Sequence, residues 1–283
     1  MKPAITLNAD LHCHSVHSDG VLTPVELARR AHGNGVRLWA LTDHDEVAGV
    51  AEAAAAAAAL GMSFVPGVEI SVTWAGRTVH IVGLRFDPAN PALTAGLAGI
   101  RVGRAERATE IGRRLDARLG MSGCLEGALR YAMNPGLVSR THFARFLVEQ
   151  GRFPTMQSVF DQHLGQGKPA NVPGRWAGLA EAVAWITGAG GRAVIAHPGR
   201  YAYSQLEYGA FFDAFKEAGG EGLEVVTGSH RPAQFDEYAK VARHYGFLAS
   251  RGSDFHSPGE SRVDLGTLPP LPEDLTTVWY DWF

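Results

Sequence analysis

The chain has 283 residues, 46% of them hydrophobic, and a formal net charge of −3. This length and composition are typical of a folded globular protein with a full hydrophobic core, and they exclude a disordered or fibrous chain. The first residues contain no long apolar stretch typical of a secretion signal, the alanine-rich run 51–60 is too short to cross a bilayer, and two cysteines do not make a disulfide framework. We therefore expect a cytoplasmic protein that does not bind membranes.

The first part of the chain alternates between predicted strands and helices. Strands are expected over residues 5–9, 36–41, 63–71 and 78–84, and helices over residues 24–33 and 47–60. This alternation indicates parallel strand pairing in an α/β fold.

The middle of the chain breaks this alternation. Residues 91–190 have helical or loop-like patterns without a convincing strand, and helices are expected over residues 92–119, 141–150 and 156–164. Residues 100–175 carry twelve Lys and Arg against six Asp and Glu, whereas the rest of the chain carries fourteen against twenty-three. The basic segment is either a solvated helical surface or a lid that attracts an anionic ligand.

The alternation returns near the C-terminus, with strands expected over residues 192–198, 222–226 and 247–250 and helices over residues 206–218 and 232–245. The sequence therefore predicts a β/α core from residues 1–90 and 191–283. A helical insertion from residues 91–190 would serve as a substrate lid.

The pattern His12-Cys13-His14 directly follows the first predicted strand. Side chains at positions i and i+2 of an extended segment share a face, so the two histidines are expected to face one metal ion and Cys13 to face away. Asp254 and His256 repeat the same spacing after the last predicted strand.

Further imidazoles and carboxylates occur at or just after the other predicted strand ends. In a barrel of parallel strands these ends meet at one rim. The expected metal ligands are His12, His14, Asp19, His44, Glu69, His80, His197, Asp254 and His256. Taken singly, several of these residues could have an ordinary structural role instead of binding metal. His44 could be a surface or capping residue, and His80 could be a core histidine.

Nine candidate ligands exceed the roughly four to six that one zinc or manganese ion takes, so they suit two or three divalent ions. A carboxylate such as Glu69 can bridge two ions. Mixed nitrogen and oxygen ligands favour manganese, with iron and zinc as alternatives, and disfavour calcium. The ions would leave the site positively charged, which favours a phosphate substrate.

These motifs resemble the polymerase-and-histidinol-phosphatase (PHP) family of metal-dependent phosphoesterases. The similar segments are residues 10–15, 18–20, 41–44, 66–69, 80, 196–198 and 252–256. The resemblance implies a distorted (β/α)7 barrel with a site for two or three metal ions. By resemblance, the three ligand sets would be His12, His14, Glu69 and Asp254; Glu69, His80 and His197; and Asp19, His44 and His256. His197 and Asp254 would also be the catalytic candidates.

Segments 139–144 and 165–170 resemble a narrower subgroup, the bacterial 3′,5′-nucleoside bisphosphate phosphatases, whose relatives also trim short RNA from the 5′ end. The first segment is predicted to begin a helix, and the free backbone N–H groups at a helix start can bind an anion. The expected substrate contacts are Arg140, Thr141, His142, Lys168 and Arg200. The alternatives are a helix cap for the first segment and a solvated loop lysine for Lys168.

The resemblance implies hydrolysis of the 3′-phosphate of nucleoside 3′,5′-bisphosphates, such as adenosine 3′,5′-bisphosphate to AMP and phosphate. It also implies 5′–3′ hydrolysis of short 5′-phosphorylated RNA. Alternatives are a histidinol-phosphate phosphatase, against which the basic insertion argues, and a generic phosphoesterase or exonuclease. An inactive metal-binding module that regulates a partner would be expected to lack ligands, and all nine are present. The expected partner is a nucleotide or short RNA, and no motif indicates a protein partner.

Overall fold

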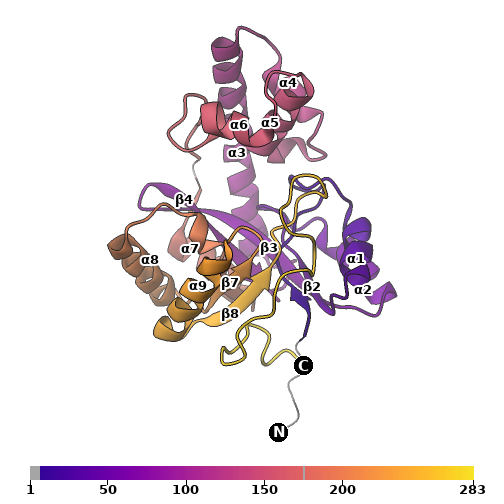
Figure 1. The fold of residues 1–283 in the computed structure, drawn as a ribbon, viewed down its shortest axis with the longest axis vertical. Helices are drawn as coiled ribbons and strands as arrows, with labels where there is room; N and C mark the ends of the chain where they lie inside the picture. Colours follow the sequence, from indigo (N-terminus) through magenta and orange to yellow (C-terminus); the bar gives the residue numbers. More distant parts are fainter. Residues whose placement is uncertain (1–6, 175) are drawn as a thin grey trace.

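The computed structural model describes residues 7–174 and 176–283. A sheet curved into a nearly closed barrel forms the lower body in Figure 1, and a group of helices projects above it. The strands are β1 (Ala9–Asp10), β2 (Leu38–Leu41), β3 (Ser63–Trp74), β4 (Arg77–Leu84), β5 (Ala177–Gly178), β6 (Arg192–Ile195), β7 (Gly222–Thr227) and β8 (Leu248–Gly252). Their order is β1-β2-β3-β4-β6-β7-β8, with β5 paired to β3. The expected α/β barrel of distorted (β/α)7 type with inserted helices is confirmed; of the first predicted strand, residues 5 and 6 lie outside the described residues.

Six predicted helices are observed within three residues of their expected bounds, and the one predicted over residues 156–164 is a short α-helix followed by a π-helical turn. The helices at residues 124–129 and 179–188 were not predicted. The α-helices are α1 (Pro24–Gly33), α2 (Val50–Ala59), α3 (Pro91–Leu119), α4 (Cys124–Leu129), α5 (Arg140–Glu149), α6 (Met156–Val159), α7 (Leu179–Gly188), α8 (Gln205–Glu217) and α9 (Pro232–Tyr245). Helices α1 and α2 cover one side of the barrel and α7, α8 and α9 the other (Figure 1). No helix in the described part of the chain combines the length and apolar character that crossing a membrane requires.

The barrel closes where the segment after β1 runs beside the end of β8. The Leu11 amide donates to the Arg251 carbonyl at 3.0 Å, and the Asp254 amide donates to the His12 carbonyl at 2.8 Å. Gly252 makes this approach feasible, because a Cβ atom there would lie 2.3 Å from the His12 Cβ atom. The two ends of the chain therefore contribute neighbouring residues to one rim.

The expectation of uniformly parallel strands is wrong for β4. Strand β4 pairs antiparallel with both β3 and β6. Residues Ala75 and Gly76 connect β3 to β4 and have φ values of 46° and 73°. Positive φ at both central residues is the geometry of a tight hairpin turn, so the chain reverses here instead of crossing over through a helix.

Two sets of buried apolar side chains show how the inserted region packs. Leu93 and Leu97, near the start of α3, pack in the barrel core, whereas Leu115, near its end, packs with α4 and α5. Helix α7 also packs in the barrel core through Val183 and Ile186. The region expected to lack strands contains the two-residue strand β5. The division of the chain at residues 91 and 190 stays a prediction, and the helices that pack apart from the barrel span a shorter stretch.

Candidate metal centre and adjoining cleft

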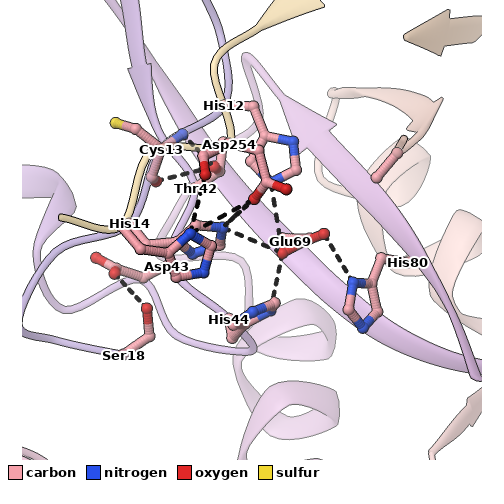
Figure 2. A network of polar contacts seen from close by, with 12 residues as sticks. His12, Cys13, His14, Ser18, Thr42, Asp43, His44, Glu69, His80 and Asp254 are labelled. Carbon is pink, nitrogen blue, oxygen red and sulfur yellow. Dashed lines mark hydrogen bonds and ion pairs between the residues drawn. The ribbon is translucent and has the colours of Figure 1, made fainter. Parts of the chain in front are cut away.

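The two histidines of the first motif face the same point from the rim next to β1. The Nε2 atoms of His12 and His14 lie 3.2 Å apart, and both side chains are fully buried. Figure 2 shows Cys13 directed away from them, and its sulfur accepts a hydrogen bond from the Trp39 indole at 3.2 Å. The alternating directions expected of this segment are therefore observed.

Glu69 is the centre of the cluster (Figure 2). Its Oε1 atom lies 2.8 Å from His80 Nδ1 and 2.8 Å from His197 Nε2. Its Oε2 atom lies 2.8 Å from His44 Nδ1, 3.3 Å from His14 Nε2 and 3.4 Å from His12 Nε2. One buried carboxylate thus contacts five imidazoles, the arrangement expected of a group that bridges metal ions.

All nine predicted ligands come together. Four overlapping groups have ligand atoms within 4.8 Å of one another: His14, Asp19, His44 and His256; His12, His14 and Asp254; His12, Glu69 and His197; and His44, Glu69 and His80. These groups share members with the three ligand sets implied by the resemblance but divide them differently, so the assignment of each ligand to an ion stays a prediction.

His80 reaches the site by a route that the sequence did not indicate. It was expected near the end of a parallel strand, but it lies inside β4, opposite Ser71 of the neighbouring antiparallel strand. Strands β3 and β4 extend beyond the rim before the hairpin joins them. A residue in the first half of β4 therefore faces Glu69.

The cluster fits divalent metal ions. Five of the predicted ligands each have a buried side-chain atom without a well-directed hydrogen bond among the described residues, namely His14 Nδ1, Asp19 Oδ1, His44 Nδ1, Glu69 Oε2 and His197 Nδ1, although some of these atoms lie close together. Buried polar atoms without partners are costly, and a cation among them would remove part of that cost. Nitrogen and carboxylate oxygen donors are also the mixed set that Mn, Fe or Zn accepts.

The protonation states of Glu69 and His14 favour metal binding as well. Burial raises the pKa of Glu69, but the facing imidazoles, His80 foremost, hold that pKa well below its ordinary value. Burial and the neighbouring His256 and His44 lower the pKa of His14 to about 3. An ionised carboxylate beside a neutral imidazole is the form in which both side chains bind metal.

Side chains behind the ligands hold them in place. Glu224 in β7 is buried, with Oε1 2.8 Å from His12 Nδ1, and its Oε2 accepts a hydrogen bond from the His197 amide at 2.6 Å. Asp43 accepts hydrogen bonds from the hydroxyls of Ser15 and Ser18, both at 2.6 Å. These contacts fix the loops that carry the ligands.

Two ligand candidates adopt backbone conformations that most residues avoid. His197 has φ 26° and Asp254 has φ 54°, both in the region that favours glycine. Each lies just beyond a strand, β6 or β8, where the chain turns across the rim. The surrounding structure must offset this strain, which is common at functional sites.

A cleft of about 720 Å³ adjoins the cluster and extends between the barrel rim and the inserted helices. Three predicted substrate contacts, Arg140, Thr141 and Arg200, line it. The Arg200 guanidinium also lies 3.2 Å from Asp254 Oδ2, which links the cleft wall to the metal centre.

The other two predicted substrate contacts are not brought to the cleft wall. His142 is fully buried, and its Nδ1 atom accepts a hydrogen bond from the Ser139 amide at 3.0 Å. It therefore caps the start of α5 together with Ser139. Lys168 is exposed and does not line the cleft.

Sequence reasoning missed two arginines of α3 that line the cleft, Arg104 and Arg107. Arg104 is buried and donates to Asp45 Oδ2 at 2.6 Å and to Ser71 Oγ at 2.8 Å. Arg107 donates to the Val172 carbonyl at 2.6 Å. Their spacing of three places them on one helix face, and the excess basic charge of this region was the available signal.

Comparisons with known proteins agree with this geometry. Residues 10–146 match the family model described as the PHP domain. The chain is 51% identical to the 3′,5′-nucleoside bisphosphate phosphatase of Chromobacterium violaceum over 96% of this chain and 95% of that protein. It is 41% identical to the 5′-3′ exoribonuclease of Haemophilus influenzae over 97% of this chain and 99% of that protein.

A solved structure from Bifidobacterium adolescentis, assigned as a metal-dependent phosphoesterase, superimposes with a TM-score of 0.80 and 29% identity. It matches over 95% of this chain and 92% of that one. The curated relatives match along nearly their whole length, and the metal-ligating cluster occupies the barrel rim. The chain therefore belongs to the PHP family and is a metal-dependent hydrolase of phosphoric esters.

Proposed function

We propose that the protein removes the 3′-phosphate from nucleoside 3′,5′-bisphosphates, with adenosine 3′,5′-bisphosphate as the model substrate. Water adds to the 3′-phosphorus, the bond between phosphorus and the 3′ oxygen breaks, and that oxygen takes up a proton. The products are inorganic phosphate and a nucleoside 5′-monophosphate. The related phosphatase of Chromobacterium violaceum carries the name of this activity.

The nine clustered side chains would hold two or three divalent ions, for which we propose manganese. When bound, these ions supply Lewis-acid polarisation of the phosphoryl oxygens and activate water for attack. The chain itself supplies orientation, because Glu224 fixes His12 and the His197 backbone from behind. His197 and Asp254 border both the cluster and the cleft, which supports a role for them next to the reacting phosphate.

The observation that carries this proposal is a pair of arginines in the same cleft, which we propose as a second anion site. Arg107 and Arg140 both line it, and neither has a carboxylate within ion-pair distance among residues 7–174 and 176–283. Burial and the neighbouring Arg140 and Arg104 lower the pKa of Arg107 to about 9, and burial with Arg200 and Arg104 lowers that of Arg140 to about 10.

Both guanidiniums remain cationic at neutral pH, and their crowding is unfavourable until an anion lies between or beside them. Each contacts a backbone carbonyl, Arg107 at Val172 and Arg140 at Leu164, which holds it on the wall of the cleft. A substrate with one phosphate at the metal centre and a second at these arginines satisfies both sites. A nucleoside 3′,5′-bisphosphate has this form.

A second candidate function is hydrolysis of short 5′-phosphorylated RNA from its 5′ end. The related Haemophilus influenzae protein is named for this activity. The chemistry is the same, since the phosphate at the metal centre would be a diester in place of a monoester. The first nucleotide would keep its 5′-phosphate at Arg107 and Arg140.

Phosphate release from adenosine 3′,5′-bisphosphate, 3′-AMP, 5′-AMP and histidinol phosphate, each with Mn²⁺, tests the proposal. Two charge-assisted hydrogen bonds to the 5′-phosphate should raise kcat/KM for the bisphosphate about 100-fold above that for 3′-AMP. Equal rates on the bisphosphate and both monophosphates, or turnover of histidinol phosphate alone, would overturn it.

The variants Arg107→Gln and Arg140→Gln separate the second anion site from the metal centre. Each should lower kcat/KM for the bisphosphate about tenfold, with a much smaller effect on 3′-AMP, which has no 5′-phosphate. Arg118→Gln is the matched control, because Arg118 is an exposed residue at the end of the same helix and does not line the cleft.

A further inference from the structure

A second cavity opens beside the metal centre and continues from the cleft. This side groove, of about 530 Å³, is lined by Gly199, Ser229, Arg231, Ala233, Gln234 and Arg262. Two of these residues, Ser229 and Arg262, also line the cleft. The volume is within the range of roughly 300–1,000 Å³ that is typical of ligand pockets.

The groove lies next to a predicted metal ligand, Asp254. The Ser229 hydroxyl lies 2.5 Å from Asp254 Oδ2. Gly199, two residues after His197, lines the groove, where its amide donates to His230 Nε2 at 2.9 Å and its carbonyl accepts from Gln234 Nε2 at 3.1 Å. Hydrogen bonds therefore hold the part of the groove wall next to the candidate metal centre.

The charge of the groove is positive. Arg231 and Arg262 are exposed, and no carboxylate lines the groove. Neither arginine has an ion-pair partner in the part of the chain that the structure describes. Free guanidiniums along an open groove suit a phosphate backbone, because their donors match phosphate oxygens in pairs.

Of the two substrates, only RNA has a further part that must extend away from the metal centre during the proposed reaction. In both substrates water adds to phosphorus and the bond to the 3′ oxygen of the first nucleotide breaks. In a bisphosphate the released group is inorganic phosphate. In RNA the same phosphorus carries a second ester oxygen, so the downstream chain must lead away from the metal centre and is released with a new 5′-phosphate.

We propose that the side groove binds the downstream nucleotides of a short RNA substrate, with Arg231 and Arg262 on their phosphates. This inference rests on the proposed function, because it takes the first nucleotide to occupy the cleft. It assigns the binding of downstream RNA to Arg231, just before α9, and to Arg262 in the loop after β8, neither of which the cleavage of a bisphosphate requires.

The test compares adenosine 3′,5′-bisphosphate with a 5′-phosphorylated adenosine trinucleotide, both with Mn²⁺. Arg231→Gln should lower kcat/KM on the trinucleotide about tenfold and change that on the bisphosphate less than about twofold. Added salt should slow the wild type on the trinucleotide more steeply than it slows R231Q, since one phosphate contact fewer remains to be screened. Arg262→Gln should lower the trinucleotide rate by a similar factor.

Arg29→Gln is the matched control, because Arg29 is an exposed arginine of α1 that lines neither cavity. The inference is wrong if R231Q and R262Q hydrolyse the trinucleotide as fast as the wild type, or if R231Q slows both substrates equally. It is also wrong if the wild type cleaves the bisphosphate but no RNA. If the wild type cleaves neither substrate, the proposed function itself fails.

Discussion

At the scale of single residues, Glu224 shows how much of the site depends on groups behind the ligands. It is 1% exposed, and its two oxygens contact two different ligand candidates, His12 through the ring and His197 through the backbone. Burial alone would lower the pKa of His12, but Glu224 and Glu69 together raise it well above the ordinary value. The carboxylate thus orients the ring and increases its basicity, which strengthens a metal ligand.

Replacing Glu224 by glutamine should weaken metal binding without removing a ligand. The amide keeps the size of the side chain, but only one of its two polar atoms can still accept a hydrogen bond, so the contact with His12 or with the His197 amide is lost. We expect the affinity for Mn²⁺ to fall about 10–100-fold, measured by titrating the metal-free protein. Glu217→Gln on the exposed face of α8 is the control, and an affinity equal to that of the wild type would contradict this role for Glu224.

At the scale of elements, the inserted helices are attached to the barrel at the site itself. Arg104 in α3 bonds Asp45, next to His44, and Ser139 before α5 donates to Asp19 Oδ2 at 3.0 Å. The Arg145 guanidinium in α5 contacts the Glu260 carboxylate through two hydrogen bonds of 2.8 and 2.7 Å. The insertion therefore helps to position ligand loops besides lining the cleft.

The Arg145–Glu260 pair should contribute to stability. Arg145 is 8% exposed, so Glu260→Gln leaves a largely buried cation without its carboxylate. We expect the free energy of unfolding to fall by about 2 kcal/mol, measured by urea denaturation. The Arg130–Glu149 pair at 3.9 Å is exposed on both sides, so Glu149→Gln should change stability by less than about 0.5 kcal/mol. Similar losses in the two variants would contradict this ranking.

At the scale of the whole molecule, the metal centre joins the two ends of the chain. Its predicted ligands come from the segments after β1 and β2, from β3 and β4, and from the segments after β6 and β8. Ions bound there would connect strands around most of the barrel. The unfolded chain has no such preformed site, so metal binding would stabilise the folded state.

Removing the metal should therefore lower thermal stability. With Mn²⁺ at about 100 times its dissociation constant, the folded state gains about 2.7 kcal/mol, which corresponds to a rise in Tm of about 5 °C for a chain of this length. Thermal unfolding of chelator-treated protein with and without added Mn²⁺ measures this shift. Ca²⁺ is the control, because imidazole ligands disfavour it; an equal shift with Ca²⁺ would argue against binding at the histidine cluster.

The sequence by itself determined the barrel class, the positions of most helices and which side chains gather in the candidate metal centre. Helix α9 was predicted with the observed bounds, because its proline start and glycine end are local signals. The nine ligands were recognisable because polar groups that follow apolar strands are themselves local patterns. Only the tertiary structure decided the reversed direction of β4, the packing of α7 on the barrel, the burial of His142 and the placement of Arg104, Arg107 and Arg231 around the cavities. These features depend on contacts between segments far apart in the chain. Periodicity and spacing describe only neighbouring residues, so they carry no information about such contacts.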